Sequence, residues 1–392
     1  MVSPTPTWQE LELYGRERVM NRRELLKMCG VGLGSIVAPS SITRATISQI
    51  ELGGSPDSTL QLNWNENPLG MASAARQAAI DAIAVGNRYP DALRGELIEA
   101  LASKHRVGTD SIILGNGSTE ILQIVTQAFA ARQPTLVLTQ PTFGILLRYQ
   151  RAFQYRVERV PLNSKFAHDL EQMKAKSQGG PSLVYICNPN NPTGTITPSR
   201  DIDSWIAESP ETTLFLVDEA YFDYVDDPSY WSAAKLAIER PNVVVTRTFS
   251  KVYGMAGMRL GYAIAHPKTA DWLRSFSPTD NANGPALAAA IASIKDKSWV
   301  DTSLDSNSRA RKITQSCLAE LDLEMLPSHT NFLMHRIEGQ LDLYIGRMRN
   351  EGIRVGRPFP PMLSYNRLTL GLPREMERFA DTLRDFRSRG WI

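Results

Sequence analysis

The sequence predicts an α/β protein, with a mostly parallel central sheet in a large domain and a small α+β domain after it. Three observations lead to this fold class. From about Thr59 onward, short and nearly continuous apolar runs alternate with amphipathic segments, which is typical of parallel strands buried between two layers of helices. Several polar motifs come directly after an apolar run. From about Ser277 the pattern changes to long amphipathic helices followed by two short strand-like runs.

Helices and strands are expected to alternate along the large domain. Apolar residues spaced three and four apart predict helices at 72–85, 94–104, 120–131 and 202–207. Apolar runs predict strands at 111–115, 135–139, 182–188, 213–220, 242–250 and 259–265. In the small domain we expect helices at 285–295 and 299–321, then strands in the runs NFLMHRI and NRLTLGL. The chain should therefore divide into a signal or disordered segment at 1–45, an N-terminal arm at 46–75, a large domain at 76–276 and a small domain at 277–392.

Composition argues against several classes of function. The 392 residues include 43 basic and 41 acidic ones, a formal net charge of +2, without the clustered basic charge that nucleic acid binding requires. The three cysteines and five histidines show no spacing typical of a metal site or of a disulfide framework. We therefore expect no metal ion and no nucleic acid partner.

The N-terminal segment has the order of an export signal. Arg22 and Arg23 precede an apolar run at 28–38, and Pro39 follows. Eleven apolar residues are too few to cross a bilayer as a helix, which takes about 20, so stable membrane insertion is not expected. The pattern resembles the twin-arginine signal and predicts a periplasmic location. The alternative is a plain tail on a cytoplasmic protein, because no A-x-A cleavage site follows.

Five polar motifs lie where expected strands end, the edge of a parallel sheet at which ligands gather. They are GNGSTE (115–120), PTFG (141–144), CNPNNPTG (187–194), VDEAYFDY (217–224) and SK (250–251). Taken alone, each motif also fits an ordinary role: a capped helix start, a core phenylalanine, a tight turn, or an acid paired with a structural arginine.

Some residues of these motifs carry distinct chemistry. Ser118 and Thr119 open a helix, where backbone N–H groups and hydroxyls suit a phosphate. Asp218 ends an apolar strand, so its carboxylate needs a cationic partner. Lys251 precedes a glycine-rich stretch that ends at Arg259, and a lysine of lowered pKa can form an imine. Together they indicate a small anionic ligand near Lys251.

Eight motifs in this order resemble those of fold-type I pyridoxal-phosphate (PLP) enzymes, in particular the class I and II aminotransferases of the histidinol-phosphate aminotransferase branch. They are NENPLG, RYPD, GNGSTE, PTFGIL, NPNNPTG, DEAYFDY, TFSKVYGMAGMRLGY and RLTLG. The spacings of 27 residues from Asn191 to Asp218 and of 33 residues from Asp218 to Lys251 are also similar to the family's. The resemblance extends from about Leu60 to the C-terminus. It implies an aspartate aminotransferase-like fold, PLP as cofactor and a homodimer.

The resemblance also implies roles around the cofactor ring. Lys251 would be the amine that binds PLP as a Schiff base and moves the substrate proton. Asp218 would pair with the pyridinium nitrogen and keep it protonated, which makes the ring an electron sink. Asn191 and Tyr221 would bond the ring's 3′-oxygen, and Phe143 would stack on the ring.

Further roles implied by the resemblance concern phosphate and substrate. The phosphate would be held by Ser118, Thr119, Ser250, Arg259 and, from the neighbouring subunit, Tyr89. Arg367 would grip the substrate carboxylate as a two-pronged pair, with Asn191, Arg357 and position 69 also at the substrate. Two positions that are often tyrosine in the family are Leu69 and Leu146 here. Either they make the substrate entrance less suited to a phosphate, or they are neutral replacements.

The resemblance therefore predicts a PLP-dependent aminotransferase that moves an amino group from an α-amino acid, or an amino-alcohol phosphate, to a 2-oxo acid. One alternative is a histidinol-phosphate aminotransferase proper. Another is a decarboxylase or carbon–oxygen lyase on the same scaffold, because a fold does not fix the reaction. A non-enzymatic regulator would need a DNA-binding domain upstream, and only about fifty-five polar or signal-like residues precede the α/β pattern that begins near Thr59.

Overall fold

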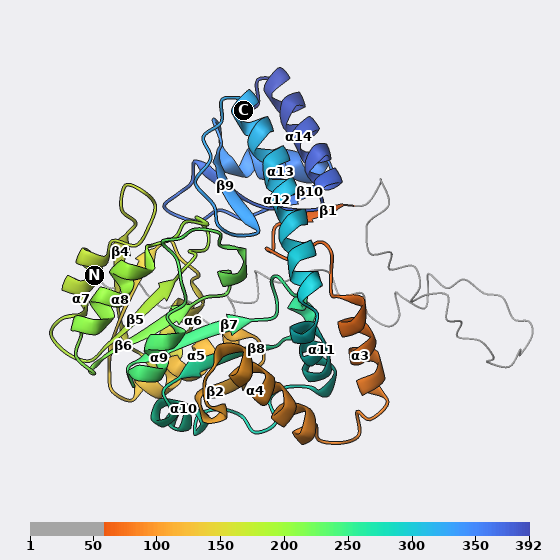
Figure 1. Cartoon of the computed structure of the whole chain (residues 1–392). Coiled ribbons are helices and arrows are strands. Elements are labelled where there is room, and N and C mark those ends of the chain that lie inside the picture. The colour runs from red at the N-terminus through yellow and green to blue at the C-terminus, as the bar shows by residue number, and fades with distance from the viewer. Residues whose placement is uncertain (1–58) are drawn as a thin grey trace, which may run out of the picture. The chain divides into compact units, whose positions relative to one another are not determined.

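The computed structural model describes residues 59–392, and this part of the chain confirms the predicted α/β class (Figure 1). Within it, the largest sheet has seven strands in the order β2-β8-β7-β6-β5-β3-β4. Strand β8 runs antiparallel to both of its neighbours, and all other neighbouring strands are parallel. The strands are β2 (Ile112–Gly115), β3 (Thr135–Gln140), β4 (Arg156–Pro161), β5 (Ser182–Cys187), β6 (Thr213–Asp218), β7 (Val243–Thr248) and β8 (Gly261–Ala265).

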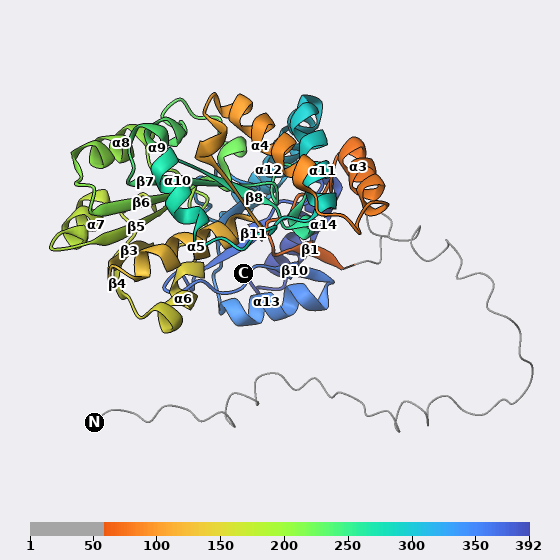
Figure 2. The ribbon, with the colours of Figure 1, turned by 90° about the horizontal axis from the view of Figure 1, so that it is seen from below.

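Helices cover both faces of this sheet, so its central strands are apolar on both sides (Figure 2). One face packs in a core with α3 (Ser73–Ile83), α4 (Asp91–His105), α7 (Leu170–Ser177), α8 (Ser199–Glu208), α9 (Ala234–Glu239) and α11 (Gly284–Lys295). The other face packs with α5 (Ser118–Ala130), α6 (Ile145–Phe153) and α10 (Pro267–Arg274). Successive side chains of a strand alternate between the two cores, so this alternation decides on which face of the sheet the last side chains of each strand lie.

A second, smaller core lies in the C-terminal part of the chain. It is formed by residues of β1 (Leu60–Leu62), α12 (Lys297–Glu320), β9 (Phe332–Arg336), α13 (Leu341–Asn350), β10 (Ile353–Val355), β11 (Tyr365–Thr369) and α14 (Pro373–Ser388). Strands β9 and β11 pair antiparallel, and β1, from the expected N-terminal arm, pairs parallel with β10. The expected boundary at 276 stays a prediction. Helix α11 follows it in the chain and packs in the larger core with α3 and α4.

Some elements were not expected from the sequence. Strand β4 is an edge strand with one fully buried side chain, Val160, so it has no apolar run to reveal it. Helices α6, α7, α9, α10, α13 and α14 were also not expected. The expected signal or disordered segment at 1–45 and residues 46–58 of the expected arm lie outside the described residues. Among the helices of residues 59–392, none is long and apolar enough to span a membrane.

Candidate functional site

A cavity of about 520 Å³ lies at the carboxyl ends of β3, β5, β6 and β7. This is the sheet edge at which the sequence motifs were expected to meet. The cavity is lined by these predicted site residues: Ser118, Thr119, Phe143, Asn191, Asp218, Tyr221, Ser250, Lys251, Arg259, Arg357 and Arg367. Segments as far apart in the chain as α5 and β11 therefore contribute to a single site.

One end of the cavity is suited to an anion. Helix α5 begins there at Ser118, and its N-terminus has no side-chain cap, so its first N–H groups can bind a negative group. Gly117, at φ 73°, precedes the helix, and a Cβ at this position would lie 2.5 Å from Nη2 of Arg259. A Cβ on Gly261 would lie 2.4 Å from the backbone nitrogen of Ser118. These glycines let the guanidinium and the helix start come close together.

Asp218 is the buried acid of the cavity. Leu214 and Leu216 of β6 belong to the core on the α5 side of the sheet, so alternation places Asp218 on that side and Glu219 on the other. Oδ1 of Asp218 accepts a hydrogen bond of 3.1 Å from the N–H of Ala220. Burial raises the pKa of the carboxyl, and hydrogen bonds to it oppose this effect.

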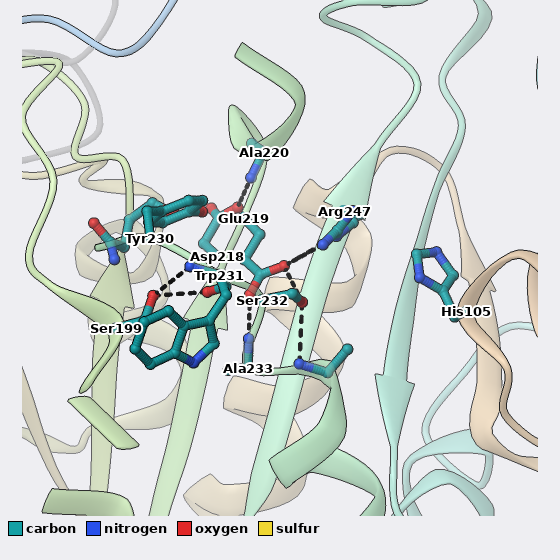
Figure 3. A network of polar contacts seen from close by, with 12 residues as sticks. His105, Ser199, Asp218, Glu219, Ala220, Tyr230, Trp231, Ser232, Ala233 and Arg247 are labelled. Carbon is teal, nitrogen blue, oxygen red and sulfur yellow. Dashed lines mark hydrogen bonds and ion pairs between the residues drawn. The ribbon is translucent and has the colours of Figure 1, made fainter. Parts of the chain in front are cut away.

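Glu219 forms a buried ion pair on the opposite face of the sheet (Figure 3). Its Oε2 accepts hydrogen bonds from Nη2 and Nε of Arg247, at 2.7 Å and 3.0 Å. Ser232 and the N–H of Ala233 also donate to this carboxylate. The Arg247 guanidinium lies 3.6 Å from the ring centre of Phe222. The pair therefore connects the end of β6, which carries Asp218, to the end of β7, which leads into Lys251.

Lys251 follows β7 and is half-buried in the cavity. Its Nζ donates a hydrogen bond of 2.9 Å to the backbone carbonyl of Asn65. Burial, and next the positive charge of Arg367, lower the pKa of this amine to about 8. Asn65 has a left-handed φ of 55°, and its side chain donates to the hydroxyl of Tyr221 at 3.0 Å. Asn65, the first residue of the NENPLG motif, therefore bonds to the Lys251 amine through its backbone and to Tyr221 through its side chain.

Two arginines of the C-terminal part reach the same cavity. Nη1 of Arg367 donates to Oδ1 of Asn191 at 2.7 Å, and Nη2 donates to the carbonyl of Asn63 at 2.7 Å. Burial lowers the pKa of Arg367 to about 10. The guanidinium of Arg357 lies 4.2 Å from the ring centre of Phe359, and that of Arg367 lies 4.8 Å from the same ring. Two cationic groups, one exposed and one buried, thus share this side of the cavity.

Three residues that were expected at the site do not line the cavity. Tyr89 is 79% exposed and lies in the segment before α4. Leu69 is half-buried and outside the lining, and Leu146 is fully buried in the core on the α5 side. The expectation that two leucines lie at the substrate entrance is therefore wrong for Leu146, because α6 turns this side chain into the core.

Several lining residues were not expected from the sequence. They include Trp64, Asn65, Glu66, Thr142, Cys187, Thr248 and Phe359. All of them except Trp64 and Phe359 lie within the motifs quoted above, so the motifs already contained the signal. Tyr185, whose hydroxyl bonds to Asp218 from the core, was not expected either. A tyrosine within an otherwise apolar strand could have revealed it, because a buried hydroxyl needs a partner.

Comparisons with known proteins agree with this geometry. Residues 57–383 match the family described as aminotransferase class I and II. The chain is 35% identical over 338 residues to histidinol-phosphate aminotransferase 1 of Cupriavidus pinatubonensis, covering 85% of this chain and 89% of that protein. A crystal structure from Erwinia carotovora atroseptica, provisionally assigned as a histidinol-phosphate aminotransferase, matches with a TM-score of 0.83 and 39% identity over 85% of this chain and 97% of that one. The histidinol-phosphate aminotransferase of Sinorhizobium meliloti, solved in complex with pyridoxal-5′-phosphate, matches with a TM-score of 0.77 and 26% identity over 84% and 92% of the two chains.

Proposed function

Because this chain belongs to the class I and II aminotransferases, in their histidinol-phosphate aminotransferase branch, and is a PLP-dependent enzyme, we propose that it transfers an amino group between histidinol phosphate and a 2-oxo acid. The observation that carries the choice of substrate is the pair of arginines, Arg357 and Arg367, which both line the cavity and both contact the ring of Phe359. Histidinol phosphate has a phosphate group where an amino acid has its α-carboxylate. Two guanidinium groups can bind either anion, so one cavity can accept both substrates in turn.

The described residues fit PLP. The uncapped start of α5, with Ser118, Thr119, Ser250 and Arg259 beside it, suits the phosphate. Asp218, a buried carboxylate in the cavity lining, suits a protonated ring nitrogen. When bound, PLP supplies an electron sink for the charge that develops at the substrate Cα.

The protein's own groups have separate tasks in this proposal. Lys251 is the amine that would hold the cofactor aldehyde and would accept the proton of the substrate Cα, because its lowered pKa leaves a fraction of the amine neutral near neutral pH. Asp218 keeps the ring nitrogen protonated. Asn191 and Tyr221, which line the cavity, would hold the 3′-oxygen of the ring, and Phe143 would stack on the ring. Arg367 then orients the substrate through its anionic group.

A set of amino donors tests the proposed substrate. The purified PLP-bound enzyme is mixed with histidinol phosphate, with phosphate-free histidinol and with common α-amino acids, and the absorbance of the bound cofactor is followed in a single half-reaction. We expect histidinol phosphate to react at the lowest concentration. No reaction with histidinol phosphate, together with a fast reaction of another donor, would contradict the substrate while leaving the aminotransferase activity in place.

Arginine variants test the observation that carries the proposal. Arg357→Met should raise the KM for histidinol phosphate about tenfold or more, because a charge-assisted hydrogen bond is lost, and should leave kcat nearly unchanged. Arg354→Met is the matched control, since Arg354 is an exposed arginine on β10 outside the cavity lining. An equal effect of both substitutions would mean that Arg357 does not contact the substrate.

We also infer that the enzyme is a homodimer. Large apolar side chains lie exposed in the N-terminal part of the described chain, at Trp64, Ile80, Ile83, Val85 and Tyr89. Trp64 lines the cavity, and the others lie on α3 and in the segment that joins it to α4. Such a cluster is expected at a contact with another protein. A second copy would cover it and would bring Tyr89 to the phosphate end of the partner's cavity.

A further inference from the structure

Tyr185 contacts the acid of the cavity from the core side. It lies on β5, and its Oη donates a hydrogen bond of 2.9 Å to Oδ2 of Asp218. Both side chains are buried, with Tyr185 fully inaccessible and Asp218 2% exposed. Oδ1 of Asp218 accepts from the N–H of Ala220. Each oxygen of the carboxylate thus has one protein donor and keeps a further lone pair for a ligand in the cavity.

The register of the sheet explains this contact. Strands β5 and β6 are parallel, and Cys187 is the partner of Asp218. Since alternate side chains share a face, Tyr185, two residues before Cys187, lies on the same face as Asp218. It belongs to the core on the α5 side, which packs tightly around its ring. The ring is therefore held by the core while the hydroxyl reaches the strand end.

We propose that Tyr185 is a positioning residue for Asp218: its hydroxyl holds the carboxylate in one orientation and in its ionised form, ready for the ring nitrogen of PLP. The inference rests on the role proposed above for Asp218. A carboxylate that rotates freely, or that is itself protonated, would stabilise the protonated ring nitrogen less. The strength of the electron sink would fall accordingly.

The electrostatics around Asp218 agree with this role. Burial raises the pKa of Asp218, and the hydrogen bond from Tyr185 is the largest effect that lowers it. The other side chains around Asp218 are Thr246 on β7, Cys187 on β5, Tyr221 after β6 and Lys251 after β7. Burial raises the pKa of both the Cys187 thiol and the Tyr221 hydroxyl, so both stay neutral. Glu219 is on the opposite face of the sheet, and its charge also raises the pKa of Asp218.

The test is Tyr185→Phe, which removes one hydroxyl and keeps the ring in the core. Tyr344→Phe is the matched control, because Tyr344 is also fully buried and its hydroxyl lies 3.4 Å from Nε2 of His335 in the smaller core. The first measurement is an infrared titration of the cofactor-free protein, with Asp218→Asn identifying the carboxyl band. We expect the pKa of Asp218 to rise by about one to two units in Tyr185→Phe and to stay unchanged in Tyr344→Phe.

The second measurement is the rate of a single half-reaction with PLP bound. The rate should fall about tenfold to a hundredfold in Tyr185→Phe and stay near wild type in Tyr344→Phe. An unmoved Asp218 pKa would overturn the inference whatever the rate does, because the effect would then not act through the carboxylate. An equal loss of rate in both variants would overturn it as well. If Asp218→Asn itself keeps full activity, the role proposed for Asp218 is wrong. If Asp218→Asn is inactive and Tyr185→Phe behaves like the wild type, only the role proposed for Tyr185 is wrong.

Discussion

Lys251 has a pKa of about 8, lowered first by burial and then by Arg367, and this value sets when its amine can react. Only the neutral amine attacks an aldehyde, so recombination of the cofactor-free protein with PLP should accelerate as the pH rises and level off above about pH 8. With an ordinary lysine, the rate of recombination would keep rising until the pH reached the pKa of about 10.4. Stopped-flow absorbance across about pH 6–10, roughly two units on each side of the lower value, measures the midpoint, and a rate still rising at the upper limit would indicate an ordinary lysine.

Arg367→Met provides the control for this midpoint. Removing a positive charge makes protonation of Lys251 easier, so the midpoint should move to higher pH. Lys251→Ala should not bind PLP covalently at any pH. A midpoint near 10 in the wild-type protein would contradict the assignment of Lys251. Covalent binding of PLP by another lysine in Lys251→Ala would contradict it as well.

Asp218→Asn should keep PLP bound through the phosphate contacts but lose most of the transamination rate. An amide cannot balance a positive charge on the ring nitrogen, so the nitrogen loses its proton and the ring withdraws electrons less strongly. We expect the half-reaction to slow about a hundredfold or more, which corresponds to about 3 kcal/mol in the barrier. A rate within a few-fold of wild type, with PLP bound, would make Asp218 a structural acid.

At the residue scale, the sequence predicted those site residues that belong to recognisable motifs at typical spacings. Asp218 ends β6, while Asn191 and Lys251 follow the neighbouring strands β5 and β7, so their meeting at one edge was implied by a parallel sheet. Tyr185 could not be assigned in this way. Its role depends on which face of β5 it occupies and on the register with β6, and a single strand of apolar residues fixes neither.

At the scale of the elements, a buried ion pair that only the structure reveals connects the ends of β6 and β7. Glu219 lies in the DEAYFDY motif and Arg247 in the expected strand at 242–250, and the sequence alone offered no reason to pair them. Strand alternation puts both on the same face of neighbouring strands, where they are almost fully buried. The elements that the sequence failed to predict have the opposite character: β4 is exposed along most of its length, so its pairing with β3 leaves no apolar pattern.

Breaking the Glu219–Arg247 pair should destabilise the protein strongly. Glu219→Leu or Arg247→Leu alone leaves one buried charge without its partner and should lower the free energy of unfolding by about 3–5 kcal/mol. The double variant should recover most of this loss, because apolar side chains of similar size avoid the desolvation of two charges. Urea denaturation measures all three variants.

The exposed pair of Lys235 and Glu239 on α9 is the control for this comparison. Its atoms are 3.9 Å apart and open to solvent, so Glu239→Gln should change the unfolding midpoint little. If the double variant is as unstable as the single ones, the loss comes from packing rather than from an unpaired charge.

At the scale of the whole molecule, the expected dimer gives Tyr89 a function that one chain alone does not provide. Its hydroxyl would bond the PLP phosphate of the partner subunit, so Tyr89→Phe should weaken PLP binding about tenfold without changing the subunit mass measured by light scattering. Ile83→Asp, in the exposed apolar cluster, should instead produce monomers with little activity. Leu343→Asp, an exposed apolar residue on α13, should change neither property. A fully active wild-type monomer at the assay concentration would end the proposal of shared sites.

The segment at 1–45, which lies outside the described residues, should decide where the enzyme is found and should not affect catalysis. We propose that Arg22 and Arg23, with the short apolar run after them, form a twin-arginine signal, because that export route reads a guanidinium pair. Replacing both arginines with lysine should therefore hold active enzyme in the cytoplasm, while the wild-type protein reaches the periplasm of a host that has this route. Deleting residues 1–45 should leave PLP binding intact, since all the lining residues of the cavity come after them in the chain. Cell fractionation with an activity assay separates the outcomes: wild-type enzyme confined to the cytoplasm contradicts the signal, and loss of PLP on deletion means that the segment supports the site instead.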